Sequence, residues 1–168
     1  ISSEEPVERK DLTHGVYREV LRHRGDAVDL RRAVAGLPLL VQHDSGRTVG
    51  IVEEVRVAGS RLEGVARFGK SALAREVWDD VAAGVLRFIS VGYTIDETRV
   101  ERAGDVTTVI ATRWTPFEVS IVGVPADSTV GIGRSRSKGG SMEPNEQGAA
   151  SNAAPASPPA APRAERAA

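Results

Sequence analysis

The sequence predicts a mainly β protein, a small antiparallel β-barrel with one or two flanking helices and a disordered C-terminal tail. Three observations lead to this prediction. Apolar and polar residues alternate with the period of a strand in most segments before residue 133. One segment alone has a strong helical period. From Gly133 to the end the chain contains no Val, Ile, Leu, Phe, Tyr or Trp, so this part has nothing to bury.

The strand pattern recurs along the chain. A turn signal at residues 58–60 joins two of the strands into a hairpin, and a polar loop around Gly104 joins two later strands. The predicted strands are Tyr17–His23, Leu37–Gln42, Thr48–Ala58, Arg61–Phe68, Leu86–Ile95, Val106–Thr112 and Phe117–Val124.

The helix is predicted between Ser71 and Gly84. Ser71 is a good N-cap residue, and Gly84 is the residue type that ends helices in a left-handed conformation. Leu73, Val77 and Val81 fall at positions i, i+4 and i+8, so they form one apolar stripe.

The domain organisation follows from the composition. We place the folded domain at residues 8–133 and an Ala/Pro/Ser-rich linker or tail at residues 134–168. The first residues, Ile1–Glu8, are acidic and expected to be frayed. Residue 1 is Ile, and no charged-then-apolar leader follows it, which favours a trimmed piece of an intracellular protein.

Composition excludes several function classes. A formal net charge of −1 argues against a nucleic-acid partner. No run of 18 apolar residues is available for a membrane span. The chain has no Cys, which removes disulfides, thiolate catalysis and Cys-based metal sites together.

Histidine is the first candidate for chemistry, because the chain has three. His43 follows an apolar strand and precedes the polar run Asp44–Gly46, so we expect it at a strand end where a turn begins. A purely structural role is the alternative. His14 lies in a predicted loop. His23 stands between arginines, whose positive field suits a solvated ring.

Ser90 and Glu118 are the other candidates. Ser90 shares a strand face with Gly92, which leaves space beside the hydroxyl; the alternative is a small polar residue on the solvent side of a strand that bulges at Gly92. Glu118 and Ser120 share one face of an otherwise apolar strand. A carboxylate there needs a partner, either an imidazole or a cation. The candidate cations are Arg67, Arg87 and Arg113.

A His, a Ser and a carboxylate without Cys favour acyl transfer. In that chemistry the imidazole takes the proton of the hydroxyl, while the carboxylate orients the ring and stabilises its protonated form.

Three segments, Leu39–Asp44, Arg87–Tyr93 and Arg113–Asp127, together resemble the prohead maturation proteases of tailed bacteriophages, which are relatives of the herpesvirus assemblins. The resemblance runs in order through most of the predicted domain. It implies a small assemblin-like β-barrel. It also implies that His43 is the base and Ser90 the nucleophile. For the third member we choose Glu118, with Asp44 and Asp127 as rivals.

The resemblance implies a serine endopeptidase without a cofactor. Such an enzyme cleaves scaffold and major capsid protein segments, and itself, inside the procapsid, after synthesis in the host bacterial cytoplasm. It leaves open a homodimer or a fusion to scaffold or capsid sequence. Met142, the single methionine, is then either a nested start of a scaffold product or an ordinary linker residue.

Two other classes are retained. One is a catalytically inactive barrel that acts as a structural assembly module of a phage capsid or tail. The other is a metal hydrolase that uses all three histidines, which their wide spacing disfavours.

Overall fold

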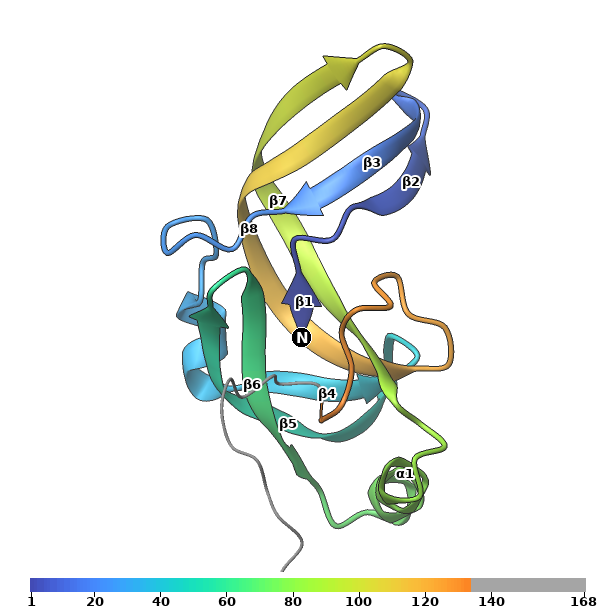
Figure 1. The fold of residues 1–168 in the computed structure, drawn as a ribbon. Coiled ribbons are helices and arrows are strands. Elements are labelled where there is room, and N and C mark those ends of the chain that lie inside the picture. The colour runs from blue at the N-terminus through green and yellow to red at the C-terminus, as the bar shows by residue number, and fades with distance from the viewer. Residues whose placement is uncertain (134–168) are drawn as a thin grey trace, which may run out of the picture. The chain divides into compact units, whose positions relative to one another are not determined.

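The structure, a computed structural model, describes residues 1–133. The predicted tail at 134–168, with Met142, lies outside the described residues. The described part consists of eight strands, one α-helix and one short 3₁₀ helix (Figure 1). The elements are β1 (Ser2–Ser3), β2 (Val7–Asp11), β3 (Gly15–Leu21), η1 (Arg31–Ala35), β4 (Leu37–Val41), β5 (Asp44–Ala58), β6 (Arg61–Phe68), α1 (Ala72–Ala82), β7 (Phe88–Ala103) and β8 (Val106–Val122).

The strands form one sheet in the order β1-β6-β5-β4-β8-β3-β2, and β7 pairs with β8 outside this path. The predicted mainly β fold with a flanking helix is confirmed. The pairing, however, is mixed, because β8 runs parallel to both β3 and β4, and the described strands do not close into a complete ring. The reason is the length of β8: β7 occupies one edge of it, while β3 and β4 share the other edge in succession.

The long hairpin of β7 and β8 corrects one prediction (Figure 1). Two strands were expected at Val106–Thr112 and Phe117–Val124, but β8 is continuous through the residues between them, Pro116 included. Proline removes a ladder donor and is tolerated at irregularities of a sheet. Here Gly92 pairs with Glu118 and Tyr93 pairs with Pro116, so Phe117 is the extra residue of a bulge and is exposed.

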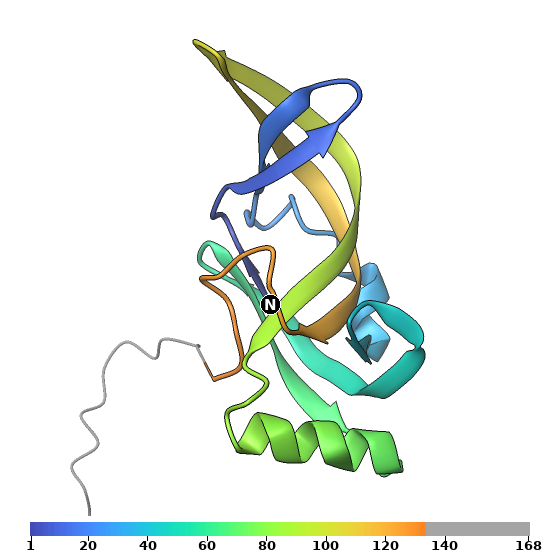
Figure 2. The ribbon, with the colours of Figure 1, turned by 90° about the vertical axis from the view of Figure 1, so that its right-hand side faces the viewer.

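The helix agrees with its prediction. The Ser71 hydroxyl accepts a hydrogen bond from the Ala74 backbone N–H, and Gly84 follows the helix with a φ of 73°. Ala74 and Val77 are buried. The helix α1 contacts β5 and β6 and lies at one end of the sheet (Figure 2).

The amino-terminal residues contradict their prediction. Ser2 and Ser3 are buried and pair with β6, so this segment belongs to the fold and is not frayed. The Ser2 hydroxyl bonds to His23, and the Ser3 hydroxyl bonds to Asp127. The domain limits 8–133 and 134–168 themselves stay a prediction.

Two clusters of buried apolar side chains form the core, and both include residues of β8. One lies under α1 and includes Leu39 and Ile121, and the other surrounds the fully buried Trp114. Among the described residues, no helix combines the length and the apolar character that a membrane crossing needs.

Candidate active site

Three neighbouring strands carry the candidate residues. β8 lies between β4 and β7, and Ser120 of β8 is in register with Leu40 on one side and with Ser90 on the other. Glu118 is likewise opposite Gly92. His43 is the second residue after β4. The sheet order therefore brings together residues that are far apart in the sequence, with the acid on the middle strand.

His43 belongs to a two-residue turn between β4 and β5. Val41 pairs with Asp44, and both Gln42 and His43 have a left-handed backbone, with φ of 55° and 59°. His43 was expected at the strand end where a turn begins, and it lies within the turn itself; after the pair of Val41 and Asp44, the next paired residue of β5 is Thr48. A left-handed conformation is unfavourable for a residue with a side chain and is common at functional sites.

Glu118 holds the ring of His43. The Nδ1 atom of His43 lies 2.7 Å from Oε1 of Glu118, whose residue is 5% exposed. A carboxylate only accepts hydrogen bonds, so Nδ1 carries a proton, and in the neutral ring Nε2 then has the lone pair. The partner of this buried carboxylate is thus the imidazole and not a cation. Of the candidate cations, Arg67 forms its ion pair with Glu53.

The two rival carboxylates have other partners. Asp44 accepts a hydrogen bond from the backbone of Gly46. Asp127 accepts hydrogen bonds from the side chains of Ser3 and Thr129. Glu118 is the carboxylate that contacts His43.

Gly92 makes room for this carboxylate. A Cβ atom placed on Gly92 would lie 2.2 Å from Oε1 of Glu118 and 2.8 Å from its carboxyl carbon, well inside van der Waals contact. The sequence pattern indicated space beside Ser90. The structure shows that the acid of the next strand fills part of that space.

Ser90 lines a cavity of about 930 Å³ together with His43 and Glu118. In the described part of the chain, no hydrogen bond joins the Ser90 hydroxyl to either ring nitrogen of His43. Hydrogen bonds between a nucleophile and its base are often loose without substrate and tighten in the complex. Ser90 and His43 thus line the same pocket without a hydrogen bond between their side chains.

Two sets of residues at the site were missed at the sequence level. Ser120 accepts a hydrogen bond from the His43 backbone and donates one to Glu118; its shared face with Glu118 was the available signal. Arg9 and Tyr93 also line the cavity, and both bond to the buried Glu19. Burial and this carboxylate raise the pKa of Tyr93 to about 12.

The other histidines have separate surroundings. His14 bonds to Asp11 in an exposed turn. The prediction that His23 is solvated is wrong: it is 1% exposed and packs edge-on against Trp114. Burial lowers its pKa from the ordinary value of 6.5. Within residues 1–133, no group of three or more metal-ligating side chains comes together.

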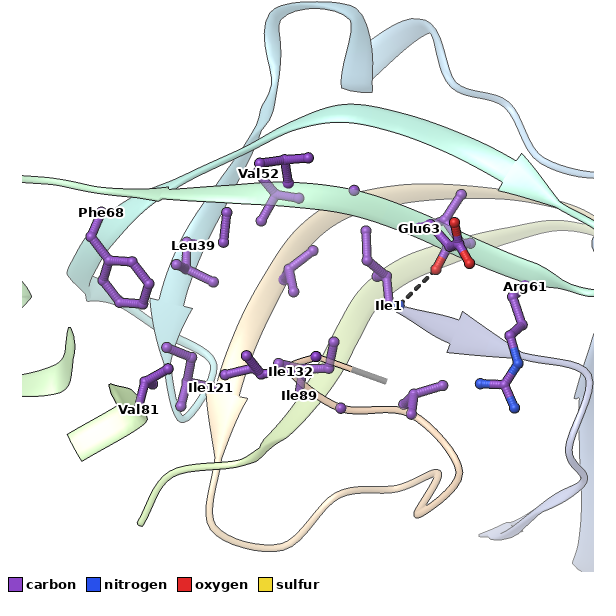
Figure 3. A pocket seen from close by; sticks show the side chains of 18 of the residues that line it. Ile1, Leu39, Val52, Arg61, Glu63, Phe68, Val81, Ile89, Ile121 and Ile132 are labelled. Carbon is purple, nitrogen blue, oxygen red and sulfur yellow. Dashed lines mark hydrogen bonds between the residues drawn. The ribbon is translucent and has the colours of Figure 1, made fainter. Parts of the chain in front are cut away.

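A second cavity, of about 340 Å³, is mainly apolar (Figure 3). Leu39, Phe68, Ile89 and Ile121 contribute side chains to it. It contains no histidine or serine among the described residues that line it, and its charged groups are the Ile1 amine, Arg61 and Glu63.

The site thus combines a buried acid in contact with an imidazole and an open pocket with a serine, which are the three residue types that a serine hydrolase uses. Residues 6–144 match the model of the caudovirus prohead serine protease family, and the chain belongs to this family. It is also 46% identical over 139 residues to a protein of Halomonas phage phiHAP-1 named major capsid protein. That match covers 80% of this chain and 22% of the relative, so the chain spans about a fifth of the relative's length. No solved structure shows a significant match.

Proposed function

We propose that the chain is a serine endopeptidase that cleaves scaffold and capsid-protein segments, and itself, during maturation of the viral procapsid. The observation that supports this most directly is the contact between His43 and Glu118 at the edge of the pocket that Ser90 lines. Membership of the prohead serine protease family supports the same reaction class.

The proposed mechanism assigns one role to each residue. The hydroxyl oxygen of Ser90 attacks the peptide carbonyl, and its proton passes to Nε2 of His43. Glu118 holds the Nδ1–H and stabilises the positive ring. The protonated ring then gives its proton to the leaving amine, which leaves an acyl ester on Ser90. Water, deprotonated by His43, hydrolyses the ester and restores the serine.

The proposed substrates are extended, unfolded segments. The pocket is wide and lies open beside β7, which suits a peptide in an extended conformation. The similarity to part of a protein named major capsid protein supports a fusion of protease and capsid sequence, which would place the enzyme inside the procapsid after synthesis in the host cytoplasm. In this proposal Ser90, His43 and Glu118 work without a cofactor.

The second candidate function is a catalytically inactive barrel that acts as a structural module of capsid assembly. The name of the phiHAP-1 relative favours it. The two candidates differ in one respect, namely whether peptide bonds are broken.

The test is cleavage by the purified chain at high concentration, alone and with the phiHAP-1 major capsid protein as substrate. We expect fragments that accumulate with time in the wild type and are absent with Ser90→Ala. Ser2→Ala is the matched control, because it removes a hydroxyl that also lies near an imidazole but is buried away from the pocket. Equal fragment patterns for wild type and Ser90→Ala would favour the structural module.

A further inference from the structure

We propose that the carboxylate of Glu118 is positioned from two sides, by the hydroxyl of Ser120 and by the missing side chain of Gly92, and that both are positioning residues for His43. The inference rests on the proposed function only for its effect on turnover. Its structural part, the orientation of the ring of His43, can be measured without any cleavage.

The Ser120 hydroxyl makes two bonds at once. It donates to Oε2 of Glu118 at 2.7 Å and accepts from the backbone N–H of His43 at 3.0 Å. The other carboxylate oxygen, Oε1, receives the ring N–H of His43. The carboxylate of Glu118 therefore bonds to the ring of His43 directly and to its backbone through the hydroxyl of Ser120.

The left-handed backbone of His43 explains why the hydrogen bond from its N–H to Ser120 is needed. The turn is two residues long, and both of them are in a conformation that residues with side chains seldom adopt. The bond from the His43 N–H to Ser120 is a side-chain contact that holds this turn against β8. Without this bond, the backbone N–H of His43 loses its partner. The backbone from which the imidazole ring extends is then no longer held in one position.

Gly92 acts on the opposite side of the carboxylate. A methyl group there would overlap Oε1, the oxygen that binds His43, and would push the carboxylate away from the ring. The neighbouring atom is the functional end of Glu118, so any relief of the clash moves the group that orients the base.

Ser120 itself is not a nucleophile. It is 0% exposed, and its proton is directed to Glu118. Ser90, opposite to it on β7, lines the pocket. The two serines of this strand pair thus differ: Ser90 lines the pocket and Ser120 donates to the acid.

The first measurement is the NMR signal of the His43 ring N–H, which a hydrogen bond to a carboxylate shifts downfield and protects from exchange. His43→Ala identifies the signal by its loss. We expect Ser120→Ala and Gly92→Ala to broaden or remove it, and Ser120→Thr, which retains the hydroxyl, to keep it. The second measurement is cleavage, for which we expect kcat to fall about 10²-fold with little change in KM, the effect of a misplaced catalytic group.

Two matched controls test whether the position matters. Thr115→Ala removes a hydroxyl that donates to a carboxylate, Asp96, between the same two strands but away from the pocket. Gly25→Ala adds a methyl group where no atom lies within 4 Å. Both are expected to keep the ring signal and the wild-type kcat.

A folded Ser120→Ala that keeps the ring signal and the wild-type kcat would overturn the role of Ser120, and the same result in Gly92→Ala would overturn the role of Gly92. If Ser120→Ala does not fold, loss of the signal in Ser120→Thr contradicts the proposal and its retention supports it. A chain that cleaves nothing, yet loses the signal in both variants, would refute the protease and support the positioning.

Discussion

Two imidazoles of this chain, His23 and His43, have opposite surroundings. His23 is buried, donates from Nδ1 to the Leu21 carbonyl at 2.9 Å, and lies 2.7 Å from the Ser2 hydroxyl through Nε2. The side chain of His43 is 47% exposed and donates from Nδ1 to a buried carboxylate. If the proposed mechanism holds, the short Ser–His contact of this chain, between Ser2 and His23, is not the catalytic pair. A free Nε2, a pocket and an acid behind the ring mark a catalytic histidine better.

The two histidines also differ in how many of their ring nitrogens form hydrogen bonds, which indicates a structural role for His23 and a functional role for His43. Both ring nitrogens of His23 form hydrogen bonds, one with Ser2 of β1 and one with Leu21 at the end of β3. The ring of His43 is fastened at one nitrogen only, on a strained turn. Residues that are held incompletely at some cost to the fold are typical of functional sites.

The largest expected difference concerns turnover. We expect His43→Ala to lower kcat about 10⁶-fold, as loss of the base does in serine proteases, because in the proposed mechanism the imidazole of His43 takes the proton of Ser90. The melting temperature should change little, because half of this side chain is exposed. The measurement is the rate of fragment formation from the capsid-protein substrate. Retained activity in this variant would remove His43 from the mechanism.

A smaller loss of turnover is expected for Glu118→Gln. The amide keeps the shape and the bond from Ser120, but it can donate to Nδ1 and thereby favours the wrong tautomer of His43. We expect kcat to fall about 10⁴-fold. Asp127→Asn is the comparison variant, since its carboxylate bonds to Ser3 and Thr129 instead. A greater loss in Asp127→Asn than in Glu118→Gln would reverse the assignment of the acid.

Local patterns of the sequence were enough for much of the fold. The hairpin at residues 58–60, the helix with its Ser71 cap and the alternating face of Ser90 depend on contacts within a few residues, and the structure has all three. The continuous β8 was missed, because whether Pro116 ends a strand depends on a bulge that its partner strand must accommodate. The parallel pairing of β8 with β3 and β4 is a long-range choice that no local period records.

The candidate site divides in the same way. The pattern could identify Glu118 as a carboxylate in need of a partner, but not which partner, because His43 reaches it only through the order of β4 and β8. The left-handed turn at His43 contains no glycine and therefore gave no signal. His23 was misjudged because its neighbours in sequence are arginines, whereas its neighbours in space are Ser2 and Trp114.

His23→Ala is expected to affect stability instead of turnover. The change leaves a cavity beside Trp114 and removes the partner of the Ser2 hydroxyl, so we expect a loss of about 2–4 kcal/mol in the free energy of unfolding. Denaturant unfolding measures this loss. Cleavage well below the melting temperature should continue at the wild-type rate. An unchanged stability would show that the buried pair of Ser2 and His23 does not hold β1.

The smallest effect is a dependence of stability on pH. Burial lowers the pKa of His23 below 6.5 in the folded chain, while the unfolded chain titrates near 6.5. Between these values the unfolded state binds more protons, so stability falls as the pH decreases below about 6.5 and the fall ends below the folded pKa. We expect a lower melting temperature at about pH 5.5 than at about pH 7.5, a range in which ordinary carboxylates stay charged. His23→Ala should reduce this difference. If the melting temperature changes equally with pH in the wild type and in His23→Ala, another group causes the change. The folded state would then not lower the pKa of His23.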